Sequence, residues 1–221
     1  MKGKRLKCII FDMDGTLVDS ESIYIEGYKR AFREKDIPIE ECVIRSWAGQ
    51  SAHDTLSQID GFTHDRKLSE ELRQMRLQYF ADALSAGNVQ LQNHAREVIA
   101  FCKSKDFKIG LATSTFSDWA IPILEKLALN HSFDFVVFGD EVKTCKPAPD
   151  IYHLAIERSG IDKDECLVLE DSKSGITAAI GADLRVVYIP DPHVKKVLTH
   201  PKIFKTVETL KHVIAIIEEL L

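Results

Sequence analysis

A short apolar run followed by acidic and turn-forming residues lies near the start of the sequence. Residues 8–20 read Cys8-Ile9-Ile10-Phe11-Asp12-Met13-Asp14-Gly15-Thr16-Leu17-Val18-Asp19-Ser20. The run 8–11 is apolar throughout and does not alternate with polar residues, which predicts a strand buried on both faces. Strands of this kind occur in parallel sheets covered by helices, so this stretch favours an α/β fold.

The same pattern recurs along the rest of the chain. Further apolar runs, rich in β-branched or aromatic residues, occupy 107–112, 135–138, 166–169 and 186–189. Apolar residues at helical spacing separate them, and a last stretch of this kind covers about 207–221. Because predicted strands alternate with predicted helices, we expect a doubly wound, Rossmann-like parallel sheet with helices on both faces.

One long interval breaks this alternation. Residues 20–86 contain no convincing strand, but apolar residues recur at helical spacing within 24–32 and within 68–83. We therefore predict an all-helical cap domain, residues 20–86, inserted after the first strand. The catalytic core would comprise residues 1–19 and 87–221.

Composition and charge restrict the partners. With 29 Lys and Arg against 34 Asp and Glu, the 221-residue chain has a formal net charge of −5, which argues against a broad basic face for nucleic acid. The apolar runs are too short for a signal peptide or a membrane span. The five cysteines form no CxxC motif, so we expect reduced thiols in a cytoplasmic protein. We expect a monomer or weak dimer that binds neither nucleic acid nor membranes.

Acidic residues follow two of the predicted strands. Asp12 and Asp14 follow the first strand, and Glu170 and Asp171 follow the run 166–169. The carboxyl ends of parallel strands meet at one edge of a sheet, so these carboxylates would repel one another without a cation. Mg²⁺ takes a few protein carboxylates while keeping waters and substrate phosphate in its shell. The sequence therefore predicts a Mg²⁺ site at this edge.

Donors for an anion come from two other positions. Thr113 and Ser114 follow the second strand, and Lys146 opens the segment Lys146-Pro147-Ala148-Pro149-Asp150. The lysine ammonium and the two hydroxyls would neutralise and bind the oxygens of a phosphoryl group. Backbone N–H groups of the turn at Asp14 and Gly15 would complete the phosphate site.

These segments together resemble the four signature motifs of the haloacid dehalogenase superfamily of phosphohydrolases. The motifs occur in the order expected for that superfamily, namely residues 11–20, Thr113, residues 146–150 and residues 169–172. The resemblance covers nearly the whole chain. It is closest to the branch with β-phosphoglucomutase, phosphoglycolate phosphatase and sugar-phosphate phosphatases, which carry a helical cap after the first motif.

The resemblance implies a role for each matching residue. Asp12 would be the nucleophile that forms an aspartyl phosphate, and Asp14 the general acid and then the base. The ligands of Mg²⁺ would be Asp12, the backbone carbonyl of Asp14, and Asp171, with Glu170 contributing directly or through another ligand. Thr113 and Lys146 would neutralise the phosphoryl oxygens, and Lys146 would also keep Asp12 ionised.

Three alternatives to a phosphatase differ from it in the residues or the domain that they require. A haloalkanoate dehalogenase needs no acid for an alkoxide, so Asp14 argues against dehalogenation. A β-phosphoglucomutase would have a histidine and an arginine where Tyr24 and Ala52 stand, which favours a phosphatase but leaves a phosphomutase open. A non-enzymatic phosphate-sensing module of the receiver type would be shorter, without a cap and without the acid.

Substrate choice would belong to the cap. A cap that closes over the sheet would exclude polymers and water, so we expect a small phosphorylated metabolite such as a sugar phosphate. The aromatic residues Tyr24, Tyr28 and Phe32 recur at helical spacing, which favours a place in the cap core over a substrate platform. The candidate substrate contacts in the cap are Ser20, Glu21, Tyr24, Trp47, Gln50, Ser51 and His53.

Overall fold

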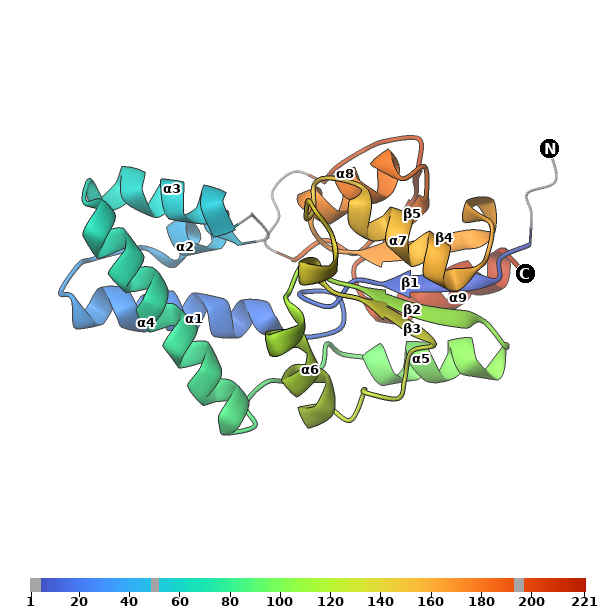
Figure 1. Cartoon of the computed structure of the whole chain (residues 1–221), viewed down its shortest axis with the longest axis horizontal. Coiled ribbons are helices and arrows are strands. Elements are labelled where there is room, and N and C mark those ends of the chain that lie inside the picture. The colour runs from blue at the N-terminus through green and yellow to red at the C-terminus, as the bar shows by residue number, and fades with distance from the viewer. Residues whose placement is uncertain (1–4, 49–51, 193–196) are drawn as a thin grey trace. The chain divides into compact units, whose positions relative to one another are not determined.

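A six-stranded parallel sheet forms the centre of the larger of two compact units (Figure 1). The computed structural model describes residues 5–48, 52–192 and 197–221. The strand order is β3-β2-β1-β4-β5-β6. The strands are β1 Cys8–Phe11, β2 Lys108–Ala112, β3 Phe135–Val137, β4 Cys166–Glu170, β5 Arg185–Tyr188 and β6 Ile203–Thr206. The order reverses between β1 and β4, where doubly wound sheets bind their ligands. The predicted α/β fold is confirmed.

Helices cover the sheet on both sides, with α7 and α8 above it and α5 below it in Figure 1. Every residue of β1 and β4 is buried, which explains why these strands lack polar alternation. The helices of this unit are α5 Ala95–Ser104, α6 Ser117–Lys126, α7 Asp150–Ser159, α8 Lys173–Gly181 and α9 Val213–Glu219. In the described part of the chain, no helix combines the length and the apolar character needed to cross a membrane.

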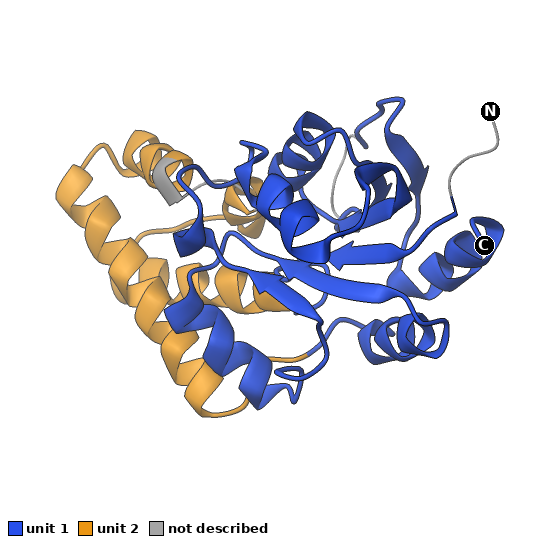
Figure 2. Ribbon diagram, turned by 45° about the vertical axis from the view of Figure 1, so that its right-hand side comes forward, with its two compact units in different colours: residues 1–18, 91–221 blue, residues 19–90 orange. Residues whose placement is uncertain are grey.

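The smaller unit comprises residues 19–90, and the secondary-structure elements in its described part are all helices (Figure 2). Its core is aromatic and aliphatic, with Tyr28, Phe32, Trp47 and Leu72 almost fully buried. Its helices are α1 Ser20–Glu34, α2 Glu41–Trp47, α3 Ala52–Thr63 and α4 Arg66–Ser85. The larger unit consists of residues 1–18 and 91–221. The chain thus enters the helical unit directly after β1 and leaves it before α5.

The C-terminal region differs from the prediction. A continuous helix over about 207–221 is wrong, because the structure has α9 only at Val213–Glu219 and an additional strand, β6, before it. Strand β6 lies at the edge of the sheet and pairs only with β5 among the described strands. Its residues Lys205 and Thr206 are exposed, so it lacks the continuous apolar run that marks a buried strand.

Gly110 in β2 provides a test of the sheet packing. A Cβ atom at Gly110 would lie 2.1 Å from the ring of Phe135, its partner in β3. We expect Gly110→Ala to lower the free energy of unfolding by about 1–3 kcal/mol, because the closely packed core has no room for a methyl group. In α3, a Cβ at exposed Gly61 would meet nothing within 4 Å. There Gly61→Ala should raise the stability by up to about 1 kcal/mol. Urea unfolding of both variants measures this, and an unchanged midpoint for Gly110→Ala would contradict the packing.

Candidate active site

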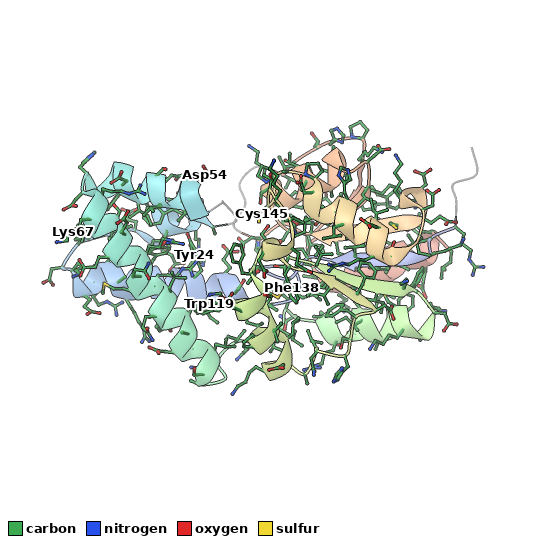
Figure 3. All side chains as sticks on the ribbon, viewed as in Figure 1. Tyr24, Asp54, Lys67, Trp119, Phe138 and Cys145 are labelled. Carbon is green, nitrogen blue, oxygen red and sulfur yellow. The ribbon has the colours of Figure 1, made fainter. Side chains whose placement is uncertain are left out.

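The carboxyl ends of β1, β2 and β4 bring the acidic and hydroxyl residues to one edge of the sheet. The register aligns Phe11 with Leu111 on one side and with Leu169 on the other, so the residues that follow these positions emerge at the same level. The segment between β3 and α7 adds Lys146. Its neighbour Cys145 and Phe138, which follows β3, lie at this edge (Figure 3).

Lys146 is a buried cation at the centre of the site. Its Nζ donates to Oδ1 of Asp12 at 2.5 Å, to Oε1 of Glu170 at 2.7 Å and to the carbonyl of Ala112 at 3.0 Å. These three acceptors match the three N–H donors of an ammonium group. Burial by itself would lower the pKa of Lys146, but the charges of Asp12 and Glu170 raise it well above its ordinary value. The lysine is therefore held in its charged form, with only 8% of its surface exposed.

Three carboxylates converge beside this lysine. Asp12, Glu170 and Asp171 each offer an oxygen atom, and these atoms lie within 4.8 Å of one another. Burial raises the pKa of Asp12 to about 8, against the lowering effect of Lys146, and Glu170 raises it further. Burial and the charges of Glu170 and Asp12 likewise raise the pKa of Asp171 well above its usual range. One lysine cannot compensate three carboxylates, so these oxygen donors fit a hard divalent cation.

Neighbouring groups hold Glu170 and Asp171 in place. Tyr152 donates to Oε1 of Glu170 at 3.2 Å, and the backbone N–H and hydroxyl of Ser172 donate to its Oε2 at 2.9 and 3.1 Å. The same Ser172 hydroxyl accepts from the N–H of Gly175 at 3.0 Å, and so caps α8. Thr16 donates to Oδ1 of Asp171 at 3.0 Å.

Asp14 lies in a different environment from Asp12. Its Oδ2 accepts hydrogen bonds from the hydroxyls of Thr115 at 2.6 Å and Thr113 at 3.3 Å. The turn after it requires Gly15, whose φ is +81° and whose Cβ, if it had one, would lie 2.1 Å from Oδ2 of Asp171. Two carboxylates with separate partners can take two chemical roles, which the implied mechanism needs.

The structure brings together the core residues selected from the sequence. Thr113 and Asp14 share a hydrogen bond, and the Oγ of Ser114 is buried without a hydrogen-bond partner among the described residues. The additional contacts that sequence reasoning missed come from Thr16, Thr115 and Tyr152. Thr16 and Thr115 stand inside the polar stretches after β1 and β2, so composition could have indicated them. Tyr152 belongs to the apolar face of α7 and carried no such signal.

The cap candidates have other positions. Ser20, Glu21 and Tyr24 belong to α1 of the helical unit, where Tyr24 is half-buried against Tyr28 and Arg76. Trp47 is buried in the hydrophobic core of that unit, so its side chain is not exposed for contact with a substrate. Gln50, Ser51 and the side chain of His53 lie outside the described part of the structure.

Gly175 provides a test of the acidic cluster. A Cβ atom at Gly175 would lie 1.5 Å from Oε1 of Glu170. We expect Gly175→Ala to push this carboxylate away from Lys146 and to weaken the binding of a divalent cation by about 10- to 100-fold, the usual cost of disturbing groups that orient ligands. Isothermal titration with Mg²⁺ measures this effect. Gly61→Ala is the matched control, and equal values for both variants would contradict this role of Gly175.

Known proteins show the same combination of sequence and fold. Residues 9–189 match the family described as haloacid dehalogenase-like hydrolase. The chain belongs to this family. A phosphorylated carbohydrates phosphatase of Thermotoga maritima is 34% identical over 83% of this chain and 84% of its own length. The fructose-1-phosphate phosphatase YqaB of Escherichia coli is 31% identical over 83% of this chain and 96% of its own length.

A solved structure of the same fold is β-phosphoglucomutase of Clostridium difficile. It superposes with a TM-score of 0.75 over 97% of this chain and 98% of its own, at 20% identity, and so shows the fold alone. The family expected from the four motifs is confirmed, and the protein is an enzyme of the hydrolase class rather than a phosphate-sensing module.

Proposed function

We propose that the protein is a Mg²⁺-dependent phosphatase that hydrolyses a small phosphorylated metabolite, such as a sugar phosphate, through an aspartyl-phosphate intermediate. The observation that carries this proposal is Lys146, buried between Asp12 and Glu170, beside an Asp14 with hydroxyl partners of its own. This arrangement supports one carboxylate as nucleophile and a second as proton carrier.

In the first step, a carboxylate oxygen of Asp12 attacks phosphorus. The bond from phosphorus to the leaving oxygen breaks, and Asp14 donates its proton to that oxygen. In the second step, Asp14 takes a proton from water, whose oxygen attacks phosphorus and releases Asp12. Thr113 and Ser114 would donate hydrogen bonds to the phosphoryl oxygens, and the positive charge of Lys146 would stabilise the negative charge on them.

Asp12, Asp171 and the backbone carbonyl of Asp14 would hold Mg²⁺, with Glu170 contributing directly or through another ligand. The ion would supply positive charge that orients the phosphoryl group and favours the ionised form of Asp12. The raised pKa of Asp12 and of Asp171 supports this assignment, because burial, and after it the neighbouring carboxylates, disfavours their charged forms, and a bound cation would offset that cost.

The names of the relatives support a sugar phosphate as substrate. The Thermotoga maritima and Escherichia coli relatives are named for phosphorylated carbohydrates and fructose 1-phosphate. We assign the choice of substrate to the helical unit as a cap, with candidate contacts at Ser20, Glu21, Tyr24, Gln50 and His53. A cytoplasmic location fits the five cysteines, all of which are free. We propose a monomer or weak dimer that binds neither nucleic acid nor membranes.

A panel of phosphorylated metabolites incubated with the protein and Mg²⁺ tests this function through phosphate release. We expect release from sugar phosphates or similar monoesters. The second candidate function is that of a phosphomutase, since this chain shares the fold of β-phosphoglucomutase. A phosphomutase would convert glucose 1-phosphate to glucose 6-phosphate without releasing phosphate. Isomerisation without release would establish the mutase, and preferential hydrolysis of a phosphoprotein would contradict a small substrate.

A further inference from the structure

The hydroxyl of Thr115 makes the shorter of the two hydroxyl hydrogen bonds to Asp14. Its Oγ1 donates to Oδ2 of Asp14 at 2.6 Å, whereas Oγ1 of Thr113 reaches the same oxygen at 3.3 Å. The four motifs include Thr113 but assign nothing to Thr115. Thr115 lies 101 positions along the chain from Asp14, so only the pairing of β1 with β2 brings the two together.

The backbone around Thr115 is fixed by the end of β3. The N–H of Thr113 donates to the carbonyl of Val137 at 3.0 Å, and the N–H of Gly139 donates to the carbonyl of Thr115 at 3.1 Å. A Cβ atom at Gly139 would lie 2.1 Å from the carbonyl oxygen of Ser114, so the two segments are in close contact. Backbone hydrogen bonds to the end of β3 therefore hold the segment that presents Thr115 to Asp14.

The hydroxyls of Thr113 and Thr115 carry one proton each, so each can donate only one hydrogen bond at a time. A threonine hydroxyl donates one hydrogen bond, so Thr113 cannot donate to Asp14 and to a phosphoryl oxygen at the same time. The Thr113 Oγ1 already accepts from the N–H of Thr115 at 3.0 Å. When the Thr113 hydroxyl donates its hydrogen bond to a phosphoryl oxygen instead, Thr115 is the remaining hydroxyl partner of Asp14 among those described.

We propose that Thr115 is a positioning residue that holds Oδ2 of Asp14 and thereby leaves Oδ1 to carry the transferred proton. This inference rests on the proposed function of Asp14. When phosphorus is transferred to Asp12, the Oδ1 proton moves to the leaving oxygen, which receives the electron pair of the broken bond. Asp14 becomes a carboxylate, and the Thr115 hydroxyl donates to it throughout.

The test compares two esters that differ in their need for an acid. An alkyl leaving group needs the proton of Asp14, whereas an activated aryl leaving group does not. For Thr115→Val we expect kcat/KM for glycerol 2-phosphate to fall by about 10- to 100-fold, and kcat/KM for p-nitrophenyl phosphate to change by less than about threefold. Thr115→Ser keeps the hydroxyl and should have kcat/KM close to the wild type with glycerol 2-phosphate as well as with p-nitrophenyl phosphate. Thr206→Val, at an exposed position of β6, is the matched control.

A second variant shows whether Thr115 acts through Asp14. In an Asp14→Asn background, Thr115→Val should cost less than about twofold further with either ester, because groups that act as a unit are not additive. A further tenfold loss, or equal losses with both esters in Thr115→Val, would overturn the proposal. Thr115→Ala replaces Thr115→Val if the latter does not fold. If the wild-type protein hydrolyses neither ester, the proposed function fails instead.

Discussion

Replacing Asp12 by asparagine is expected to reduce kcat for p-nitrophenyl phosphate by at least about four orders of magnitude. The amide cannot attack phosphorus, so no aspartyl phosphate forms and the two-step route is lost. The fold should remain intact, because Lys146 keeps its hydrogen bonds to Glu170 and to the carbonyl of Ala112. Turnover of the aryl ester and the far-ultraviolet circular dichroism spectrum measure the two effects.

The matched control is Asp106→Asn. Asp106 is exposed, and its φ of +56° is a conformation that asparagine also adopts readily. This control should keep the activity and stability of the wild type. A phosphate adduct found by mass spectrometry in the wild type and not in Asp12→Asn would support the nucleophile directly. Turnover of Asp12→Asn within about tenfold of the wild type would remove Asp12 from its assigned role.

Chelation of divalent ions is expected to abolish hydrolysis, with recovery when Mg²⁺ is added. The physical reason is the group of three carboxylates with oxygens within 4.8 Å of one another, which one lysine cannot neutralise. Ca²⁺ should fail to restore activity, because it takes six to eight ligands in a looser geometry, about 2.3–2.6 Å away, and would misplace the nucleophile. Phosphate release from the preferred monoester measures the recovery.

Thermal unfolding gives a readout of Mg²⁺ binding that does not depend on activity. An ion that binds only the folded protein raises the free energy of unfolding with the logarithm of its concentration once that concentration exceeds Kd, and so raises the midpoint of unfolding. Asp171→Asn should reduce this rise, whereas Asp106→Asn should leave it unchanged. Full hydrolytic activity in Ca²⁺, or an unaltered response to Mg²⁺ in Asp171→Asn, would contradict the proposed metal site.

The local pattern of the sequence was sufficient for most of the sheet. Strands β1 and β4 are buried at every position, so they appear as short apolar runs that cannot be confused with amphipathic helices. Strand β6 could not be recognised in this way, because an edge strand with exposed Lys205 and Thr206 has no continuous apolar run. Helices α2 and α3 were also missed individually, since helical spacing was recognised only within 24–32 and 68–83, which fall in α1 and α4.

The acidic cluster was indicated by residue type and position, since Asp12, Glu170 and Asp171 each stand at or just after the end of a buried strand. The hydrogen-bond partners of Lys146 could not be predicted from the sequence in the same way. Its three acceptors come from three different strands or strand ends, and no spacing in the sequence specifies that Asp12 and Glu170 share one ammonium group. The resemblance to the haloacid dehalogenase superfamily predicted that Lys146 keeps Asp12 ionised. Only the packing of the strand ends shows which three atoms accept its hydrogen bonds.

The sequence by itself determined the α/β class and the residues at the carboxyl ends of the strands, and it predicted a helical insertion after the first strand. These features depend on the spacing of apolar residues and on strand ends, which are local properties. Only the tertiary structure decided that Thr115 bonds to Asp14, that Tyr152 bonds to Glu170 and that Gly175 has no room for a side chain. These contacts join side chains whose positions depend on strand register and on the packing of α7 and α8, and register and packing arise from long-range burial.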